Sequence, residues 1–197
     1  MNKPNLKIKI GSMEMKNPVT VASGTFGYGP EYAELVDLNR LGAITVKGIC
    51  PEEHVGNQTP RTFETRGGML NAIGLPGPGA KGFIEKYVPF LKQYDTPVIV
   101  NIWGKGMDDY GRVVEMLDDE DTVSAYEINL SCPNVKEGGS AFGTDVDTFS
   151  RVIELVRGKT QKPIIPKLAP NVPNIAAFAK AAENCGSDAI AIMNTMP

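Results

Sequence analysis

Histidine and cysteine are scarce in this chain. His54 is the only histidine in 197 residues, and the three cysteines, at positions 50, 132 and 185, show no Cys-x-x-Cys spacing. A zinc or iron–sulfur site needs several such ligands close together, and a disulfide framework needs an even set of cysteines. The sequence therefore predicts no metal site within this chain and reduced thiols, and we interpret His54 as a surface loop residue.

The chain also lacks long apolar runs and clusters of one charge. No apolar stretch approaches the roughly 18 residues that a membrane span needs, and the first residues lack the apolar core of a signal peptide. The net charge is −3 and no run of Lys and Arg exceeds two residues, so no basic surface for nucleic acid is expected. These absences predict a cytoplasmic protein with neither a nucleic-acid nor a membrane partner.

Apolar segments of strand length alternate with segments of helical pattern along most of the chain. Hydrophobic residues make up 42% of the sequence, enough for a substantial core. Continuous apolar strands separated by helices are typical of a parallel sheet wrapped by helices. A hairpin is expected first, at 6–10 and 13–15, followed by strands at 19–22, 43–46, 98–102, 125–130, 164–168 and 189–193, and by helices at 31–38, 82–94, 108–117, 146–157 and 174–184.

Two closures fit this order, a doubly wound open sheet and a (β/α)8 barrel. No Gly-x-Gly-x-x-Gly turn follows the first strand, which weakens the dinucleotide-binding open sheet. We therefore predict an α/β fold, a (β/α)8 TIM barrel in a single domain over 1–197, with only the first six β/α units present. A barrel usually takes about 250 residues, so we expect the natural polypeptide to continue for roughly 100 more. Polar residues that end successive strands, as at the top of a barrel, are Ser23, Lys47, Asn101, Asn129, Lys167 and Asn194.

Cys132 differs from the other two cysteines in its surroundings. It follows the strand at 125–130, lies between Ser131 and Pro133, and precedes a glycine-rich stretch. A buried, inert cysteine is expected among apolar neighbours, whereas a thiol in the loop after a barrel strand lies at the edge that carries chemistry. Cys132 is therefore the candidate catalytic residue, and we interpret Cys50 and Cys185 as structural.

Segments along nearly the whole chain resemble the class 1 dihydroorotate dehydrogenases, most nearly the NAD-linked 1B branch. The run from Asn129 to Asn134, Asn-Leu-Ser-Cys-Pro-Asn, resembles the family segment that contains a cysteine base. Two features depart from the family pattern: the run Leu-Pro-Gly-Pro-Gly at 75–79 and the bulky Trp103, which we interpret as a packing residue. Further segments that resemble the family, in its order, lie at 21–27, 46–48, 71–75, 163–170 and 193–195.

The resemblance implies an FMN-dependent enzyme that oxidises (S)-dihydroorotate to orotate in pyrimidine biosynthesis. Cys132 would be the general base, Lys167 would neutralise charge on the reduced flavin, and Lys47 would contact both flavin and substrate carboxylate. The implied cofactor-binding residues are Ser23, Lys47, Gly48, Asn101, Asn129, Lys167 and Met193, and the implied substrate-binding residues are Lys47, Asn71, Ala72, Ile73, Gly74, Leu75, Asn129, Asn194 and Thr195.

The 1B branch further implies a homodimer of catalytic subunits with an electron-transfer subunit that carries FAD and a [2Fe–2S] cluster and reduces NAD. Two other interpretations stay open. A dihydropyrimidine dehydrogenase-like flavoenzyme shares the Asn-x-Ser-Cys-Pro segment but acts on uracil or thymine, and an inactive barrel fragment would bind no flavin. Lys47 favours dihydroorotate, because only that substrate carries a carboxylate that needs a cation. The electron acceptor, NAD or another such as fumarate, stays open as well.

Overall fold

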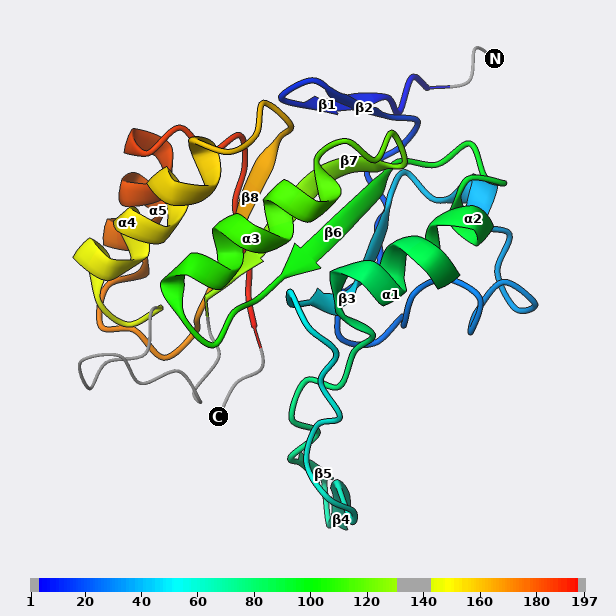
Figure 1. Cartoon of the computed structure of the whole chain (residues 1–197), viewed down its shortest axis with the longest axis horizontal. Coiled ribbons are helices and arrows are strands. Elements are labelled where there is room, and N and C mark those ends of the chain that lie inside the picture. The colour runs from blue at the N-terminus through cyan, green and yellow to red at the C-terminus, as the bar shows by residue number, and fades with distance from the viewer. Residues whose placement is uncertain (1–3, 131–142, 195–197) are drawn as a thin grey trace.

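A computed structural model describes residues 4–130 and 143–194 of the chain. Its centre is a curled, five-stranded parallel sheet in the order β3-β6-β7-β8-β9 (Figure 1). The strands are rich in Val and Ile, whose branched side chains fit a buried pleated surface. Their bounds are β3 Ile44–Ile49, β6 Val98–Ile102, β7 Val123–Asn129, β8 Ile164–Leu168 and β9 Ala191–Ile192.

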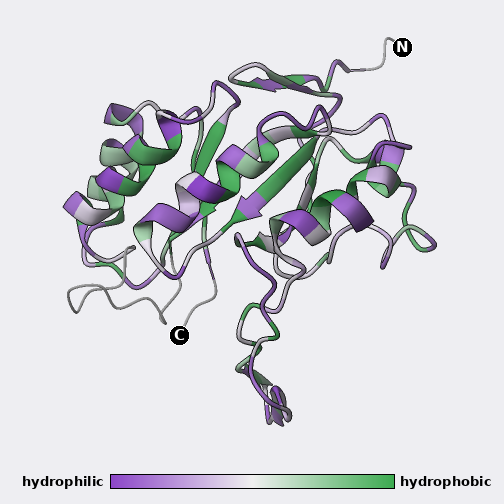
Figure 2. Cartoon of the chain, in the orientation of Figure 1, coloured by the Kyte–Doolittle hydropathy of each residue, from purple (hydrophilic) through white to green (hydrophobic). Residues whose placement is uncertain are grey.

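Helices cover one face of this sheet in the part of the chain that the structure describes (Figure 1). The main core lies between helices and sheet and includes the fully buried Tyr110, Tyr126 and Phe149. Figure 2 shows β6 and β8 mainly in the colour of hydrophobic residues. No described helix has the length and apolar character needed to cross a membrane. The helices are α1 Gly79–Lys86, α2 Val88–Leu91, α3 Met107–Leu117, α4 Val146–Arg157 and α5 Ile175–Asn184.

The opposite face of the sheet is covered at one end by the predicted hairpin, β1 Ile8–Ile10 and β2 Met13–Met15. A doubly wound sheet has helices on both faces, whereas helices cover only one face of this sheet within the described ranges. The arrangement is that of part of a barrel, with the helix-free face as the interior. The small apolar cluster on this face consists of Met13, Met15, Ala43, Ile99, Ala125 and Ile165.

The predicted strand at 19–22 is wrong as a regular element, although its place beside β3 is as expected. It is reduced to one parallel bridge between Thr20 and Ala43, supported by contact of the Thr20 and Thr45 hydroxyls at 3.0 Å. Gly42 permits this approach, because a Cβ there would lie 1.9 Å from the carbonyl oxygen of Asn17. Close backbone packing therefore replaces a full ladder at this edge.

Two predicted helices are also corrected. In place of the α-helix expected at 31–38, residues 31–36 form turns and a bend that lead into a short 3₁₀ helix, η1 Leu38–Arg40. Leu35 is 79% exposed, so this segment buries no continuous apolar face, and short helices without such burial are marginal in water. The helix expected at 82–94 divides into α1 and α2, because Pro89 near the start of α2 has no N–H to continue the ladder.

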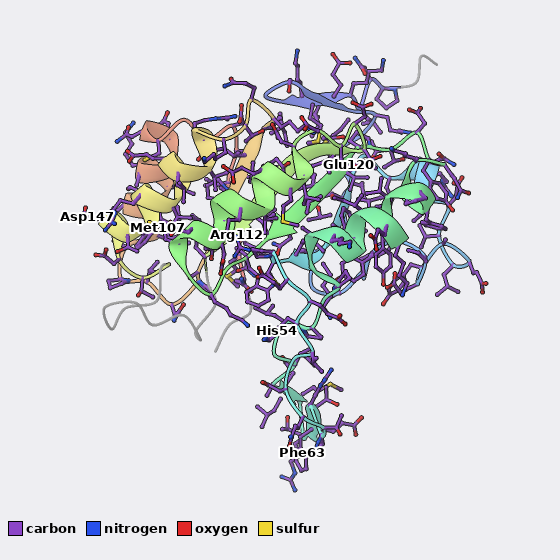
Figure 3. The ribbon with its side chains drawn as sticks, in the orientation of Figure 1. His54, Phe63, Met107, Arg112, Glu120 and Asp147 are labelled. Carbon is purple, nitrogen blue, oxygen red and sulfur yellow. The ribbon has the colours of Figure 1, made fainter. Side chains whose placement is uncertain are left out.

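A projecting arm, residues 55–76, was not predicted. It contains an antiparallel hairpin, β4 Thr62–Thr65 and β5 Gly68–Asn71, that extends away from the sheet (Figure 1). A backbone bridge between His54 and Gly77 closes its base, and Phe63 lies near its far end (Figure 3). Every residue of the two strands is exposed. Without a buried face the hairpin has no clean hydrophobic alternation by which to recognise it.

Candidate active site

The carboxyl ends of β6, β7 and β8 carry polar side chains on the helix-free face of the sheet. Side chains alternate between the two faces of a strand, so residues two apart share a face. The sheet register pairs Asn101 with Glu127 and Asn129 with Lys167. An apolar layer of Ile99, Ala125 and Ile165 is therefore followed, two residues on, by a polar layer of Asn101, Glu127 and Lys167.

Glu127 links two of the predicted cofactor-binding residues. The side-chain amide of Asn101 donates to its Oε1 at 2.6 Å, and the Nζ of Lys167 lies 3.5 Å from the same oxygen. Lys167 also donates to the Oγ of Ser23 at 3.3 Å. Asn101, Ser23 and Glu127 are buried, and only 13% of the Lys167 side chain is exposed. The structure thus brings Ser23, Asn101 and Lys167 into one network around Glu127.

Asn129 and Asn194 form a second pair at the same edge. The side-chain amide of Asn194 donates to Oδ1 of Asn129 at 2.9 Å, and the backbone N–H of Asn194 donates to the carbonyl of Leu168. The hydroxyl of Tyr110, fully buried on α3, donates to the backbone carbonyl of Asn129 at 2.9 Å. The end of β7 is therefore held from both faces of the sheet.

Lys47 and Gly48 lie in β3, at the side of the sheet nearest the arm. Burial lowers the pKa of the Lys47 ammonium, the nearby Arg61 guanidinium lowers it further, and the Glu31 carboxylate partly opposes both. A Cβ at Gly48 would lie 2.8 Å from Trp103 and 2.9 Å from Oδ1 of Asn101. Only glycine fits there without displacing a residue of the network.

The predicted substrate segment, residues 71–75, belongs to the arm and returns from it to the core. Asn71 ends β5 and is exposed, and the N–H of Ala72 donates to the carbonyl of Arg61 at 2.8 Å. Asn57 donates from its side chain to the carbonyl of Ala72 and from its backbone to that of Ile73. These bonds anchor 71–75 within the arm, so the structure does not draw Asn71 into the strand-end network. Gly74 has φ +77°, and Leu75 packs against the core.

Three other predicted residues lie at or beyond the limits of the description. Cys132 and Thr195 fall outside the described residues. Met193, after β9, is 45% exposed.

Cys50 is buried and donates to the carbonyl of Glu52, which agrees with a structural role. Within the described ranges, no cluster of His, Cys, Asp or Glu is arranged to hold a metal ion.

Sequence reasoning missed Glu127. An acid inside the apolar run at 125–130, two residues before Asn129, was a usable signal, because that spacing places both side chains on one face.

His54 differs from the predicted surface loop residue in its burial. It is half-buried, with its ring edge-on to Trp103 at 5.3 Å between centroids. Trp103 itself is a core packing residue, as predicted.

Comparison with known proteins identifies the family of this chain. A profile described as "Dihydroorotate dehydrogenase" matches residues 5–196. This chain belongs to the dihydroorotate dehydrogenase family. A relative from Desulforamulus reducens, "Dihydroorotate dehydrogenase B (NAD(+)), catalytic subunit", is 52% identical over 98% of this chain and 64% of its own length. A protein of the same name from Alkaliphilus metalliredigens is 52% identical over 100% of this chain and 65% of its length.

A solved structure supports the barrel assignment. A dihydroorotate dehydrogenase from Eimeria tenella, crystallised with ferulenol, superposes with a TM-score of 0.78 at 21% identity, over 98% of this chain and 60% of that one. At this identity the likeness concerns the fold alone. The chain thus spans about 64% of the length of a relative such as the Desulforamulus protein, and its five parallel strands form part of the family's barrel.

Proposed function

We propose that this chain forms the flavin- and substrate-binding part of a B-type dihydroorotate dehydrogenase, which oxidises (S)-dihydroorotate to orotate in pyrimidine biosynthesis. The observation that carries the proposal is Lys167 at the carboxyl edge of β8, with only 13% of its side chain exposed and held between Ser23 and Glu127. A fixed cation at that edge of a barrel is suited to a cofactor that gains negative charge.

The donor set of the strand-end network fits FMN. Reduced flavin concentrates negative charge at N1 and O2, and the Lys167 ammonium with the Ser23 hydroxyl offers a cation and a donor for that edge. Beside Ser23, a Cβ added to Gly24 would meet nothing within 4 Å, so the backbone next to Ser23 is open. We assign FMN contacts to Ser23, Lys47, Gly48, Asn101, Asn129, Lys167 and Met193. When bound, FMN would supply the hydride acceptor.

The protein's own residues would then orient the substrate and remove one proton. Lys47 would pair with the substrate carboxylate, and the amides of Asn129 and Asn194 would meet its flat ring. Asn71 to Leu75 and Thr195 would complete the substrate contacts. Cys132, three residues beyond the end of β7, would take the proton from C5 of dihydroorotate as the general base.

The names of the relatives support a separate electron-transfer partner. They are catalytic subunits of an NAD(+)-linked enzyme. We propose that a partner subunit with FAD and a [2Fe–2S] cluster passes electrons from this chain to NAD, that catalytic subunits pair as a homodimer, and that the enzyme acts in the cytoplasm.

One experiment tests the function directly. The purified protein is loaded with FMN, made anaerobic and mixed with dihydroorotate, while flavin absorbance near ~450 nm is followed. Rapid bleaching by dihydroorotate but not by dihydrouracil is the expected result. Bleaching by dihydrouracil instead would support the dihydropyrimidine dehydrogenase-like alternative, and failure to bind FMN would refute the proposal.

A further inference from the structure

Glu127 is the only charged residue among the buried residues that the structure describes. It lies on the barrel-interior face of β7, directly after the apolar layer that includes Ala125, Ile99 and Ile165. An isolated carboxylate in such a place is destabilised by lost hydration, unless a cation and hydrogen-bond donors compensate it. Its position therefore depends on the groups that face it.

Those groups are two residues that we assign to the flavin. Asn101, on the neighbouring strand β6, donates to Oε1 at 2.6 Å, and Lys167, on β8, places Nζ 3.5 Å from the same atom. One carboxylate oxygen thus joins three adjacent strands at the level where the cofactor is expected. The Lys167 ammonium also donates to the Oγ of Ser23 at 3.3 Å, a second contact that fixes its position.

We propose that Glu127 is a positioning residue that sets the reduction potential of the bound flavin through Lys167, an inference that rests on the proposed function. It holds the ammonium at the strand end and offsets part of its positive charge. Without the carboxylate, Lys167 would stabilise the anionic reduced flavin more strongly. With its charge partly neutralised by Glu127, Lys167 would favour hydride uptake by the flavin. The reduced flavin would not be stabilised so strongly that it fails to pass its electrons to an acceptor.

The test is the midpoint potential of bound FMN in wild type and in Glu127→Gln, measured by anaerobic dye titration. Glutamine keeps an oxygen to accept from Asn101 but removes the charge. We expect a more positive midpoint in Glu127→Gln. The shift should correspond to about a tenfold gain in affinity for reduced over oxidised FMN, the effect of removing one unit charge that lies a few ångströms from the flavin but not in contact with it. A merely structural role for Glu127 would lower stability and leave the midpoint unchanged.

Matched variants make the result interpretable. Glu115, on α3, forms an exposed ion pair with Lys159. Glu115→Gln removes the same charge there, and its midpoint should equal that of wild type. If Glu127→Gln does not fold, Glu127→Asp draws the carboxylate back by one methylene and should shift the midpoint in the same direction by less.

An unchanged or more negative midpoint in the Gln variant, or in the Asp variant where that one is used, would overturn the inference alone. A wild-type protein that binds no FMN would overturn the proposed function and this inference with it.

Discussion

The thiol of Cys132 is the residue on which the proposed chemistry depends most. Replacing it by alanine removes the base but none of the groups assigned to flavin binding. We expect Cys132→Ala to bind FMN and orotate as wild type does and to slow flavin reduction by dihydroorotate about 10² to 10⁴-fold, the usual contribution of a positioned base. Stopped-flow absorbance measures this directly.

The serine variant supplies the control for that prediction. A hydroxyl is a much weaker acid than a thiol, so Cys132→Ser should also be slow but recover as pH rises. Flavin reduction at the wild-type rate in Cys132→Ala would show that another group takes the proton.

Lys47 should give the substrate site a distinctive pH dependence. Its pKa is lowered first by burial and then by Arg61, so its positive charge is lost at lower pH than that of an ordinary lysine. The ammonium is present below that pKa and absent above it, so orotate binding should weaken as pH rises through the lowered pKa. Titration of orotate against the flavin spectrum at several pH values measures the effect.

Arginine at the same position separates charge from shape. Arg keeps its charge throughout this range, so Lys47→Arg should bind orotate with little dependence on alkaline pH, whatever its absolute affinity. Wild-type affinity that stays constant up to about pH 10, near the ordinary lysine pKa, would contradict the role of Lys47.

At the level of secondary-structure elements, the edge beside β3 depends on one glycine. The backbone of 17–19 approaches Gly42 so closely that a Cβ would lie 1.9 Å from the Asn17 carbonyl. Gly42→Ala should lower the free energy of unfolding by about 2–3 kcal/mol, because the obstacle is backbone that cannot rotate away. Urea denaturation measures the loss.

Gly67 provides the comparison for this prediction. A Cβ there would meet nothing within 4 Å. Gly67→Ala, in the turn of the arm hairpin, should therefore change stability by no more than about 0.5 kcal/mol. Equal effects of the two substitutions would mean that the close approach at Gly42 is not what holds this edge.

The elements show where sequence patterns succeed. Strands β6, β7 and β8 and helices α3, α4 and α5 lie close to the predicted ranges, because each buries a strongly apolar strip against a neighbour. The failures have the opposite cause. The segment at 31–38 leaves Leu35 exposed, and both strands of the arm hairpin are exposed, so neither carries a pattern set by burial.

For the whole molecule, the arm is a separable feature. Its bonds run largely within itself, and Asn57 and Ile73 are joined at its base. Replacing residues 58–72 by two glycines should leave the thermal unfolding midpoint and FMN affinity nearly unchanged, since the sheet and the strand-end network lie elsewhere. Orotate affinity should fall at least tenfold, because Asn71 is lost.

Calorimetry and flavin titration distinguish the possible outcomes for the arm. A large drop in the unfolding midpoint would show that the arm supports the sheet. Unchanged orotate binding would show that Asn71 and its neighbours do not contact the substrate.

Local sequence determined the repeating order of strand and helix, the polar residues at the strand ends and the resemblance to the family, because burial periodicity and short motifs are properties of neighbouring residues. Tertiary structure alone decided which of those polar residues meet. Glu127 touches Asn101 and Lys167 only because β6, β7 and β8 lie side by side: the register pairs Glu127 with Asn101, and Lys167 lies two residues beyond the β8 partner of Glu127 on the same face. The structure also decided that Asn71 belongs to a projecting arm, because both strands of the arm hairpin are exposed and carry no burial pattern that the sequence could reveal.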